Sequence, residues 1–487
     1  MKIAVYAFAN TAYFFHALIR EAKHTCEIEW SVILPRGHRR HLFNGLVADD
    51  RVFYLYRHFD QEYERTKQPF HITFPDWADN IFLSLSKDKD GYRHLDKDEQ
   101  LRRGATTYSL YKKNLETARP DYMLFPDLET VDGFILINLC YELGIEPIYY
   151  VSTRNLGRSF FTHSPYEELP RYFGHYTAED VPLADEALTL FAKGQLSATR
   201  MASACSGNNV APIEQPGLLR RMLDNVAVYF RYERLYKGED NFIQKVKANI
   251  KPALYLYRKF RFKMFQTCYF DIRSLDDKLP ENFVLFALQY TPESSINGLE
   301  PYFIDQTRAI DLIRHSLPSG YYLLVKEHPA IAGVRSNSFY ETLRHMPGIQ
   351  LVHPSVLTMS LVEKAKLVAS ITGTIGLECF LAGRPCMLFG RNFFKHLCGS
   401  YESYPDFARN LRKLLFEFQP PTAEDKRMAL ARIFNVSSNC YLGDPLAQPM
   451  IMDGENIRNY LAAVMKHISR LSESKSDQAS SSNPGSC

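Results

Sequence analysis

Short apolar runs alternate with helical patterns along the first 150 residues of the chain. The runs are rich in Val, Ile, Tyr and Phe, as buried strands are, and apolar positions at helical spacing separate several of them. Strands joined by crossover helices predict a mostly parallel sheet with helices on both faces. The predicted strands are residues 2–8, 29–35, 51–57, 121–127 and 147–152, and the predicted helices include 13–23 and 131–143.

A second alternation of the same kind begins at residue 282. The fold class predicted for the chain is therefore α/β, with two Rossmann-like, doubly wound domains facing a central cleft. The strands predicted for the second domain are 282–290, 320–328, 349–353, 367–371 and 385–390, and its predicted helices are 302–315, 338–346, 359–365 and 375–381.

The stretch between the two alternations lacks strand signals. We expect an N-terminal domain over 1–200, a helical linker region over 201–280 and a second domain over 281–400. Helical patterns continue over 401–472, and the Ser-rich tail at 473–487 has the low-complexity composition of a disordered segment.

The linker region contains a stretch of cations and aromatic residues, 245–265, that has no acidic residue. One interpretation is a surface that contacts anionic lipid or a polyanionic glycan, which would place the protein peripherally at the inner face of the cytoplasmic membrane. The other is a solvated connecting helix whose aromatic stripe packs on a core. The cations are Lys245, Lys247, Lys251, Arg258, Lys259, Arg261 and Lys263, and the aromatic residues are Tyr255, Tyr257, Phe260, Phe262 and Phe265.

Composition narrows the choice of protein class. With 487 residues, 46% apolar and 23% charged, the chain has the profile of a soluble globular protein of two domains. A formal charge of +3 gives no bulk attraction to nucleic acid, so any anion site must be local. The cysteines lack disulfide-framework or zinc-site spacing, and no window is apolar enough to span a membrane. These features favour a cytoplasmic location.

The loop after the 367–371 strand has the composition of a phosphate site. Ligands of open α/β sheets bind at the carboxyl ends of the strands. Thr372, Gly373 and Thr374 place two hydroxyls and a flexible glycine at the start of a helix, where backbone N–H groups are free. Glu378, one helical turn later, could accept hydrogen bonds from a ribose or complement the helix dipole. The alternative is an ordinary glycine turn in which Thr374 caps the helix.

The 320–328 strand ends in a second group of residues that suits an anion. His328 can donate one ring hydrogen to a phosphate oxygen, Pro329 fixes the direction of the chain, and Lys326 adds charge nearby. A histidine that faces a phosphate should have a raised pKa. The alternative is a histidine with a structural role. Three other histidines, His315, His345 and His353, lack the spacing of a zinc site, so we predict neither a metal nor a cofactor.

Several of these motifs occur together, and in this order, in a known family. The segments FALQYTPESSI, LPSGYYLLVKEHP, LVHPS and ASITGTIGLECFLAGRPCMLFG resemble the capsular polysaccharide biosynthesis family, which includes bacterial transferases of the acidic sugar Kdo. The resemblance implies the two-domain GT-B arrangement, with the nucleotide-sugar on the second domain and a glycan or glycolipid acceptor approaching the first. It also implies a CMP-activated donor, CMP-Kdo, whose phosphate His328, Pro329, Thr372 and Thr374 would hold. CMP leaves as a phosphate monoester, so hydrogen-bond donors and a helix N-terminus can replace a metal.

Catalysis by such an enzyme also needs a carboxylate from the first domain. Asp127, Glu129 and Asp132 lie where the fourth predicted strand meets a helix, and one of them could deprotonate the acceptor hydroxyl or attack the anomeric carbon. Helix capping by these acids is the alternative. Arg154 and Arg158 follow the next strand and could receive the carboxylate of an acidic sugar or a phosphate of the acceptor.

The leading hypothesis is a glycosyltransferase that moves an acidic sugar onto a capsular or lipopolysaccharide-type surface glycan. A sugar-nucleotide epimerase is a second hypothesis, because such enzymes share the fold and a similar glycine and hydroxyl loop followed by a glutamate. A third is a non-catalytic protein of capsule assembly or export. Fold-level likeness does not fix the donor sugar, the acceptor or the linkage.

Overall fold

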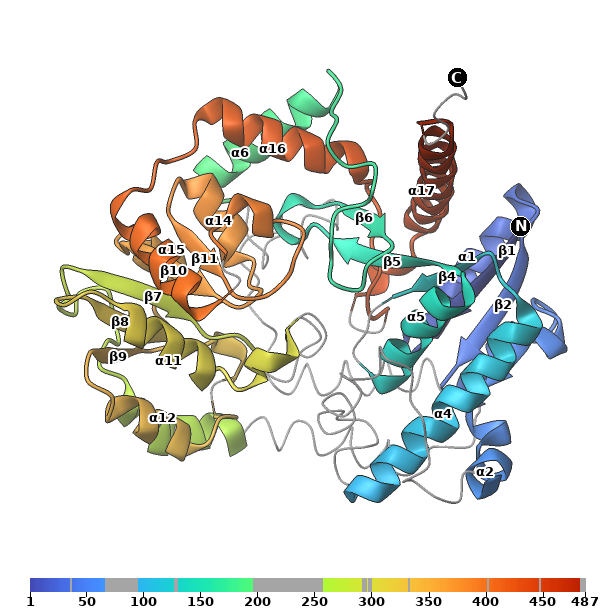
Figure 1. Cartoon of the computed structure of the whole chain (residues 1–487), viewed down its shortest axis with the longest axis horizontal. Helices are drawn as coiled ribbons and strands as arrows, with labels where there is room; N and C mark the ends of the chain where they lie inside the picture. Colours follow the sequence, from blue (N-terminus) through green and yellow to red (C-terminus); the bar gives the residue numbers. More distant parts are fainter. Residues whose placement is uncertain are drawn as a thin grey trace, which may run out of the picture. The chain divides into compact units, whose positions relative to one another are not determined.

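The computed structural model describes residues 1–35, 37–65, 95–126, 130–195, 257–290, 296, 300–331, 333–400, 403–445 and 448–481. The chain forms two compact units (Figure 1). The first consists of Met1–Glu239 together with Arg427–Cys487, and the second of Asp240–Lys426. Most of the predicted linker region, 201–280, lies outside the described residues, which resume at residue 257.

The first unit is built on a six-stranded sheet with strand order β3-β2-β1-β4-β5-β6. The first five strands in this order are parallel, and β6 pairs antiparallel with β5 at the edge. This is the order of a Rossmann-type sheet, whose switch point lies between β1 and β4. The strands are β1 (Lys2–Tyr6), β2 (Glu29–Leu34), β3 (Val52–Tyr54), β4 (Tyr122–Phe125), β5 (Glu146–Ser152) and β6 (Ser159–Thr162).

Apolar periodicity explains how helices cover this sheet. All but the first residue of β1 is buried, and Ile3 and Val5 share a core cluster with Phe14 and Leu18 of α1. Because alternate residues of a strand point to opposite faces, the remaining apolar residues of the central strands lie on the other face of the sheet. The helices of the described residues up to 195 are α1 (Thr11–Thr25), α2 (Tyr56–Arg65), α4 (Lys97–Ala118), α5 (Val131–Leu143) and α6 (Asp180–Ala192).

The C-terminal part of the chain returns to the first unit. Helix α17 (Gly454–Ser481) runs beside α1 (Figure 1), and the ring of Tyr460 lies 4.9 Å from that of Phe14 and 5.1 Å from that of Phe161. Helix α16 (Ala423–Val436) contains the point at which the chain passes from one unit to the other. Helix α17 continues to Ser481, into the tail for which low complexity predicts disorder, because its Ala, Lys, Glu and Gln residues can extend an existing helix.

The second unit is built on a five-stranded parallel sheet with strand order β11-β10-β7-β8-β9. This is again a Rossmann order, and its switch point lies between β7 and β10. Helices α11, α12 and α15 contribute apolar side chains to one core cluster with all five strands. The strands are β7 (Phe283–Ala287), β8 (Tyr322–Lys326), β9 (Ile349–Val352), β10 (Leu367–Ser370) and β11 (Cys386–Leu388), and the helices are α11 (Thr307–Ser316), α12 (Asn337–Arg344), α13 (Thr358–Val362), α14 (Ile375–Ala382) and α15 (Tyr404–Phe416).

The predicted α/β class with two Rossmann-like sheets is confirmed, whereas a cleft between the domains stays a prediction. The predicted strand at 51–57 is shorter, since β3 ends at Tyr54 and a helix begins at Tyr56. Of the basic and aromatic stretch, residues 245–256 lie outside the described residues, and 257–265 are helical. Within the described part of the chain, no helix combines the length and hydropathy needed to cross a membrane.

Candidate functional site

The topology of the second unit brings four loops to one edge of the sheet. The register pairs Ala287 at the end of β7 with Lys326 at the end of β8, and Lys326 with Val352 at the end of β9. On the other side of β7, Phe286 pairs with Ala369 of β10. Because these strands are parallel, the loops that follow them leave from the same edge, which is where ligands bind in such sheets.

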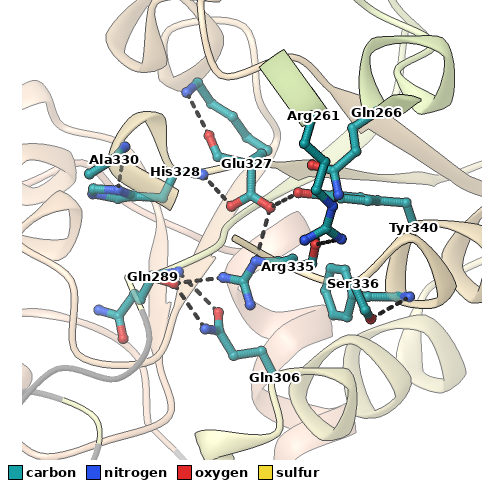
Figure 2. Close-up of polar contacts among 12 residues, drawn as sticks. Arg261, Gln266, Gln289, Gln306, Glu327, His328, Ala330, Arg335, Ser336 and Tyr340 are labelled. Atoms are coloured by element: carbon teal, nitrogen blue, oxygen red, sulfur yellow. Dashed lines mark hydrogen bonds and ion pairs between the residues drawn. The ribbon is translucent and has the colours of Figure 1, made fainter. Parts of the chain in front are cut away.

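Glu327 is the centre of a buried hydrogen-bond network at this edge (Figure 2). Its side chain is 1% exposed. The carboxylate accepts from the backbone N of His328 at 2.6 Å, from Arg335 Nε at 2.9 Å and from the hydroxyl of Tyr340 at 2.7 Å. A buried carboxylate is tolerated when a cation and hydrogen-bond donors compensate its lost hydration. Glu327 therefore fixes the backbone from which the His328 side chain projects.

Arg335 connects this network to the loop after β7. Its Nη2 donates to the carbonyl of Gln289 at 2.7 Å. Gln306 donates from Nε2 to the same carbonyl at 3.0 Å and accepts from the backbone N of Gln289 at 3.0 Å (Figure 2). Arg335 thus joins the loops after β7 and β8, and Gln306 holds the backbone of Gln289 in place.

The hydrogen bond at Nδ1 fixes the tautomer of His328. Nδ1 lies 3.2 Å from the backbone N of Ala330 and accepts from it, so the hydrogen of the neutral imidazole lies on Nε2. Burial, followed by the cations of Lys326 and Arg335, lowers the pKa of His328. In the protein alone, the two cations and desolvation act on the ring in the same direction. The raised pKa predicted for a histidine that faces a bound phosphate stays a prediction. A neutral ring with a hydrogen on Nε2 still donates one hydrogen bond.

Lys326 is turned into the protein and is only 3% exposed. Its ammonium lies 3.4 Å from the carbonyl oxygens of both Glu327 and Pro354, and it joins the loops after β8 and β9. Burial lowers the pKa of Lys326 to about 8. Pro329 is exposed and begins the short 3-10 helix Pro329–Ile331. A direct contact of either residue with a phosphate stays a prediction.

The loop after β10 lies against the loop after β7. Thr372 is fully buried, and the side-chain oxygen of Gln289, in the amide orientation that satisfies its hydrogen bonds, accepts from the backbone N of Thr372 at 3.1 Å and of Gly373 at 2.5 Å. A side chain at position 373 would not fit, since a Cβ on Gly373 would lie 2.6 Å from Ser370 Oγ and 3.0 Å from the side-chain amide of Gln289. Ser370 Oγ is buried and has no hydrogen-bond partner among the described residues. Gly373 thus keeps the backbone close to two polar side chains.

Helix α14 begins directly after this loop. Thr374 occupies its N-cap position, but it has helical backbone angles and its side chain makes no capping hydrogen bond. Thr374 therefore stands at the N-cap position of the alternative interpretation without capping the helix through its side chain, and its contact with a phosphate stays a prediction. Glu378 lies half-buried in the first turn, where a carboxylate complements the helix dipole. Its contact with a ribose stays a prediction.

The acidic residues predicted in the first unit are only partly described. Asp127 and Glu129 lie outside the described residues, and Asp132 is half-buried in the first turn of α5. Thr130 caps this helix, because its hydroxyl accepts from the backbone N of Gly133 at 3.4 Å. Capping thus does not depend on the acids, and a catalytic role for one of them is untested.

The two predicted arginines of the first unit both have protein partners. Arg154 Nη2 lies 2.7 Å from each carboxylate oxygen of Glu167. Arg158 donates from Nε to the hydroxyl of Ser437 at 3.0 Å and from Nη2 to its carbonyl at 2.9 Å. Arg158 therefore fastens the returning C-terminal chain to the first unit, a role that spacing in the sequence did not suggest. Binding of a substrate carboxylate by either arginine stays a prediction.

The sequence located the loops but missed several of the residues that shape them. Gln289, Tyr340 and Ser370 were not singled out. An amide side chain that directly continues an apolar run, as Gln289 does, is the signal that could have found one of these buried polar groups. Within the described ranges, no group of three His, Cys, Asp or Glu side chains is arranged to hold a metal ion.

Fold and site define the class of protein: an α/β chain with a Rossmann-type sheet in each of two units and a cluster of hydrogen-bond donors at the carboxyl edge of the second sheet. The sequence model of the family described as capsule polysaccharide biosynthesis protein matches residues 219–406. The resemblance drawn from the motifs is confirmed for this segment, which contains all five strands of the second unit and their loops.

Comparison with solved structures gives matches at low identity. The UDP-GlcNAc 2-epimerase of Methanocaldococcus jannaschii matches with a TM-score of 0.25 and 10% identity over 89% of this chain and 99% of that one. The beta Kdo 2,4 transferase KpsC of Thermosulfurimonas dismutans matches with a TM-score of 0.36 and 11% identity over 64% and 79%. Its beta Kdo 2,7 transferase matches with a TM-score of 0.31 and 10% identity over 75% and 90%. Similarity at this level carries no argument about activity. No curated protein matches the chain.

Proposed function

We propose that the protein is a glycosyltransferase of capsule-type polysaccharide synthesis that transfers an acidic sugar, Kdo, from CMP-Kdo to a glycan or glycolipid acceptor. The family match supports this proposal because it covers the whole loop cluster at the carboxyl edge of the second sheet. In this proposal the second unit binds the nucleotide-sugar and the first unit supplies the acceptor side.

The observation that carries the proposal is the orientation of His328. The bond from Ala330 N to Nδ1 leaves Nε2 as the hydrogen-bond donor of a neutral ring. As the bond to the sugar breaks, negative charge grows on the phosphate of CMP, and a donor that is already oriented stabilises that charge without reorganisation. Thr374 and the backbone at Gly373 would add further donors from the start of α14. Pro329 would direct the chain away from the phosphate, and Lys326 would supply positive charge behind it.

The remaining chemistry is assigned to the first unit. Asp127, Glu129 or Asp132 would act as the base that deprotonates the acceptor hydroxyl, or as a nucleophile if the reaction proceeds by double displacement. Arg154 or Arg158 would receive the carboxylate of the sugar, and binding at Arg154 would compete with Glu167. In the second unit, Glu378 would contact the ribose.

Product analysis tests the proposal. The protein is incubated with CMP-Kdo and a Kdo-terminated glycolipid, and the mixture is separated by chromatography. We expect free CMP together with an elongated glycan, and we expect both to be lost in His328→Ala. His345→Ala, which removes an exposed histidine at the end of α12, is the matched control and should retain activity.

Two results would contradict the proposal. Conversion of a UDP-sugar to its epimer without an acceptor would show the epimerase activity. An unchanged donor in the presence of acceptors, from protein that still binds CMP, would indicate a non-catalytic role in capsule assembly.

A further inference from the structure

Residues 257–266 form a helical segment with two different faces. An α-helical turn at 257–261 continues directly as the π-helix Phe262–Gln266. Phe262 points toward the core of the second unit, where its ring lies 5.8 Å from that of Phe270. Other side chains of the segment are exposed, so its two faces differ in environment.

The inner face is fastened to the loop that carries Arg335. Arg261 Nη2 and Gln266 Nε2 both donate to the backbone carbonyl of Arg335, at 2.9 and 2.8 Å (Figure 2). The backbones come so close that a Cβ on Gly333 would lie 2.1 Å from the carbonyl oxygen of Arg258. The segment is therefore held to the same loop whose arginine pairs with Glu327.

The outer face consists of six exposed residues, four apolar and two cationic. The exposed fractions of the large apolar side chains are 60%, 57%, 58% and 54% for Tyr257, Phe260, Met264 and Phe265. Scattered apolar side chains are normal on a protein surface, but a group on one short segment marks an interaction site. The six residues are Tyr257, Lys259, Phe260, Lys263, Met264 and Phe265.

The charge of the outer face favours lipid over a protein partner. Lys259 and Lys263 alternate with the apolar side chains, and the sequence from 245 to 265 contains no Asp or Glu. Lysine is depleted from the centres of protein interfaces. Lysine interleaved with aromatic residues is typical of segments that lie on an anionic bilayer, where the rings enter the headgroup region and the ammonium groups meet phosphates.

We propose that this outer face binds the surface of a membrane that contains anionic phospholipid. The four apolar side chains enter the headgroup region, and the two lysines contact lipid phosphates. Because the inner face holds the Arg335 loop, the bound protein keeps the candidate site of the second unit close to the lipid phase. The proposal goes beyond the glycosyltransferase assignment and does not depend on it.

Vesicle sedimentation tests this proposal with the full-length chain. Vesicles of equal parts phosphatidylglycerol and phosphatidylcholine are compared with vesicles of phosphatidylcholine alone, at low and at high ionic strength. We expect binding to the anionic vesicles that weakens with salt. Lys259→Gln with Lys263→Gln should weaken binding about thirty-fold, the effect of removing two cations from an anionic surface. Phe260→Ser with Phe265→Ser should weaken it by at least about tenfold because insertion of apolar surface is lost.

Matched controls lie elsewhere on the same unit. Lys364→Gln with Lys366→Gln removes two exposed lysines, and Phe416→Ser removes a phenylalanine that is 62% exposed; each should bind vesicles as the wild type does. Absence of binding to anionic vesicles would overturn the proposal, as would unchanged binding in both double variants. A wild-type dimer that Phe260→Ser with Phe265→Ser converts to a monomer would assign the face to a second copy instead. Thermal stabilisation by CMP, measured on the same variants, separates a failure of this proposal from a failure of the proposed function.

Discussion

His328 and Lys326 lie at the end of β8, and burial lowers the pKa of both side chains. For His328 the consequence is a neutral ring near pH 7 that offers a single hydrogen on Nε2. For Lys326 the consequence is a cost to stability. The folded protein holds its proton less tightly than the unfolded chain does, and the cost is fully present below a pH of about 8.

Replacement of Lys326 by methionine should remove this cost. The pKa falls from 10.5 to about 8, so the charged form costs the folded protein about 3 kcal/mol near pH 7. As the pH rises through 8 toward 10.5, wild-type Lys326 loses its proton and the cost disappears. Lys326→Met should therefore be more stable than the wild type at pH 7, and the difference should narrow by about 2 kcal/mol at pH 10. Calorimetric unfolding at the two pH values measures this. A difference that is the same at both would contradict the account.

Gly373 is the second residue whose role is set by its immediate surroundings. Gly373→Ala would place a methyl group 2.6 Å from Ser370 Oγ, and overpacking of this kind costs about 1–3 kcal/mol. We expect a lower melting temperature and weaker binding of CMP. Because the closest atom is the serine hydroxyl, Ser370→Ala in the same chain should restore part of both. Failure of the second substitution to restore either property would show that Ser370 is not the obstacle.

At the scale of elements, the loop after β8 is shaped by residues that β8 does not contain. Glu327 receives hydrogen bonds from Arg335, which precedes α12, and from Tyr340 within α12. Arg335 in turn reaches the loop after β7. The ion pair between Arg335 and Glu327 connects these contacts, and the two side chains are 11% and 1% exposed, respectively.

Breaking this pair should destabilise the second unit strongly. Glu327→Gln leaves the guanidinium of Arg335 buried without an anion, which costs about 3–5 kcal/mol. Arg335→Met leaves the carboxylate of Glu327 buried without a cation, at a similar cost. The double variant should lose less than the sum of the two single variants, because neither charge is then left alone. Calorimetric unfolding measures each term of this cycle.

An exposed pair on α15 provides the control. Arg409 and Asp406 lie 3.0 Å apart with side chains that are 71% and 34% exposed. Asp406→Asn should change stability by less than about 1 kcal/mol, as exposed ion pairs usually do. If the double variant loses as much stability as the two single variants together, Glu327 and Arg335 are independent and the coupling is disproved.

The strands of the second unit were predictable because buried parallel strands are short continuous apolar runs with polar ends. This pattern located the loops that carry His328 and Thr372. It could not supply the partners of Glu327, since Arg335 and Tyr340 reach it only through the path of the intervening loop. Nor could it reveal the orientation of the His328 ring, which depends on the backbone N of Ala330.

At the scale of the whole molecule, the first unit is discontinuous in sequence. Arg427–Cys487 belongs to the same unit as Met1–Glu239. No local pattern marks such a return, because helical periodicity shows that a segment is amphipathic but not which sheet it covers. The helical prediction for 401–472 could therefore not divide that segment between two units.

Tyr460 of α17 tests this arrangement. Its ring is fully buried against Phe14 and Phe161, and its hydroxyl is buried with no hydrogen-bond partner in the described part of the chain. Tyr460→Ala should cost about 3–5 kcal/mol through the cavity it leaves. Tyr460→Phe should be neutral or stabilising, because it removes only an uncompensated hydroxyl. Trp30, buried in the same core cluster, reports the unfolding by fluorescence. Equal stability of Tyr460→Ala and the wild type would show that α17 is not part of this core.

Calorimetric titration of CMP, UDP and GDP into the wild type and His328→Ala tests the central claim most directly, that the second unit holds the phosphate of a CMP-sugar through Nε2 of His328. We predict that only CMP binds the wild type, and that His328→Ala lowers its affinity by at least about tenfold, the usual worth of a hydrogen bond to a charged group. His345→Ala should bind CMP as the wild type does. Equal affinity for UDP, or undiminished CMP binding by His328→Ala, would contradict the account.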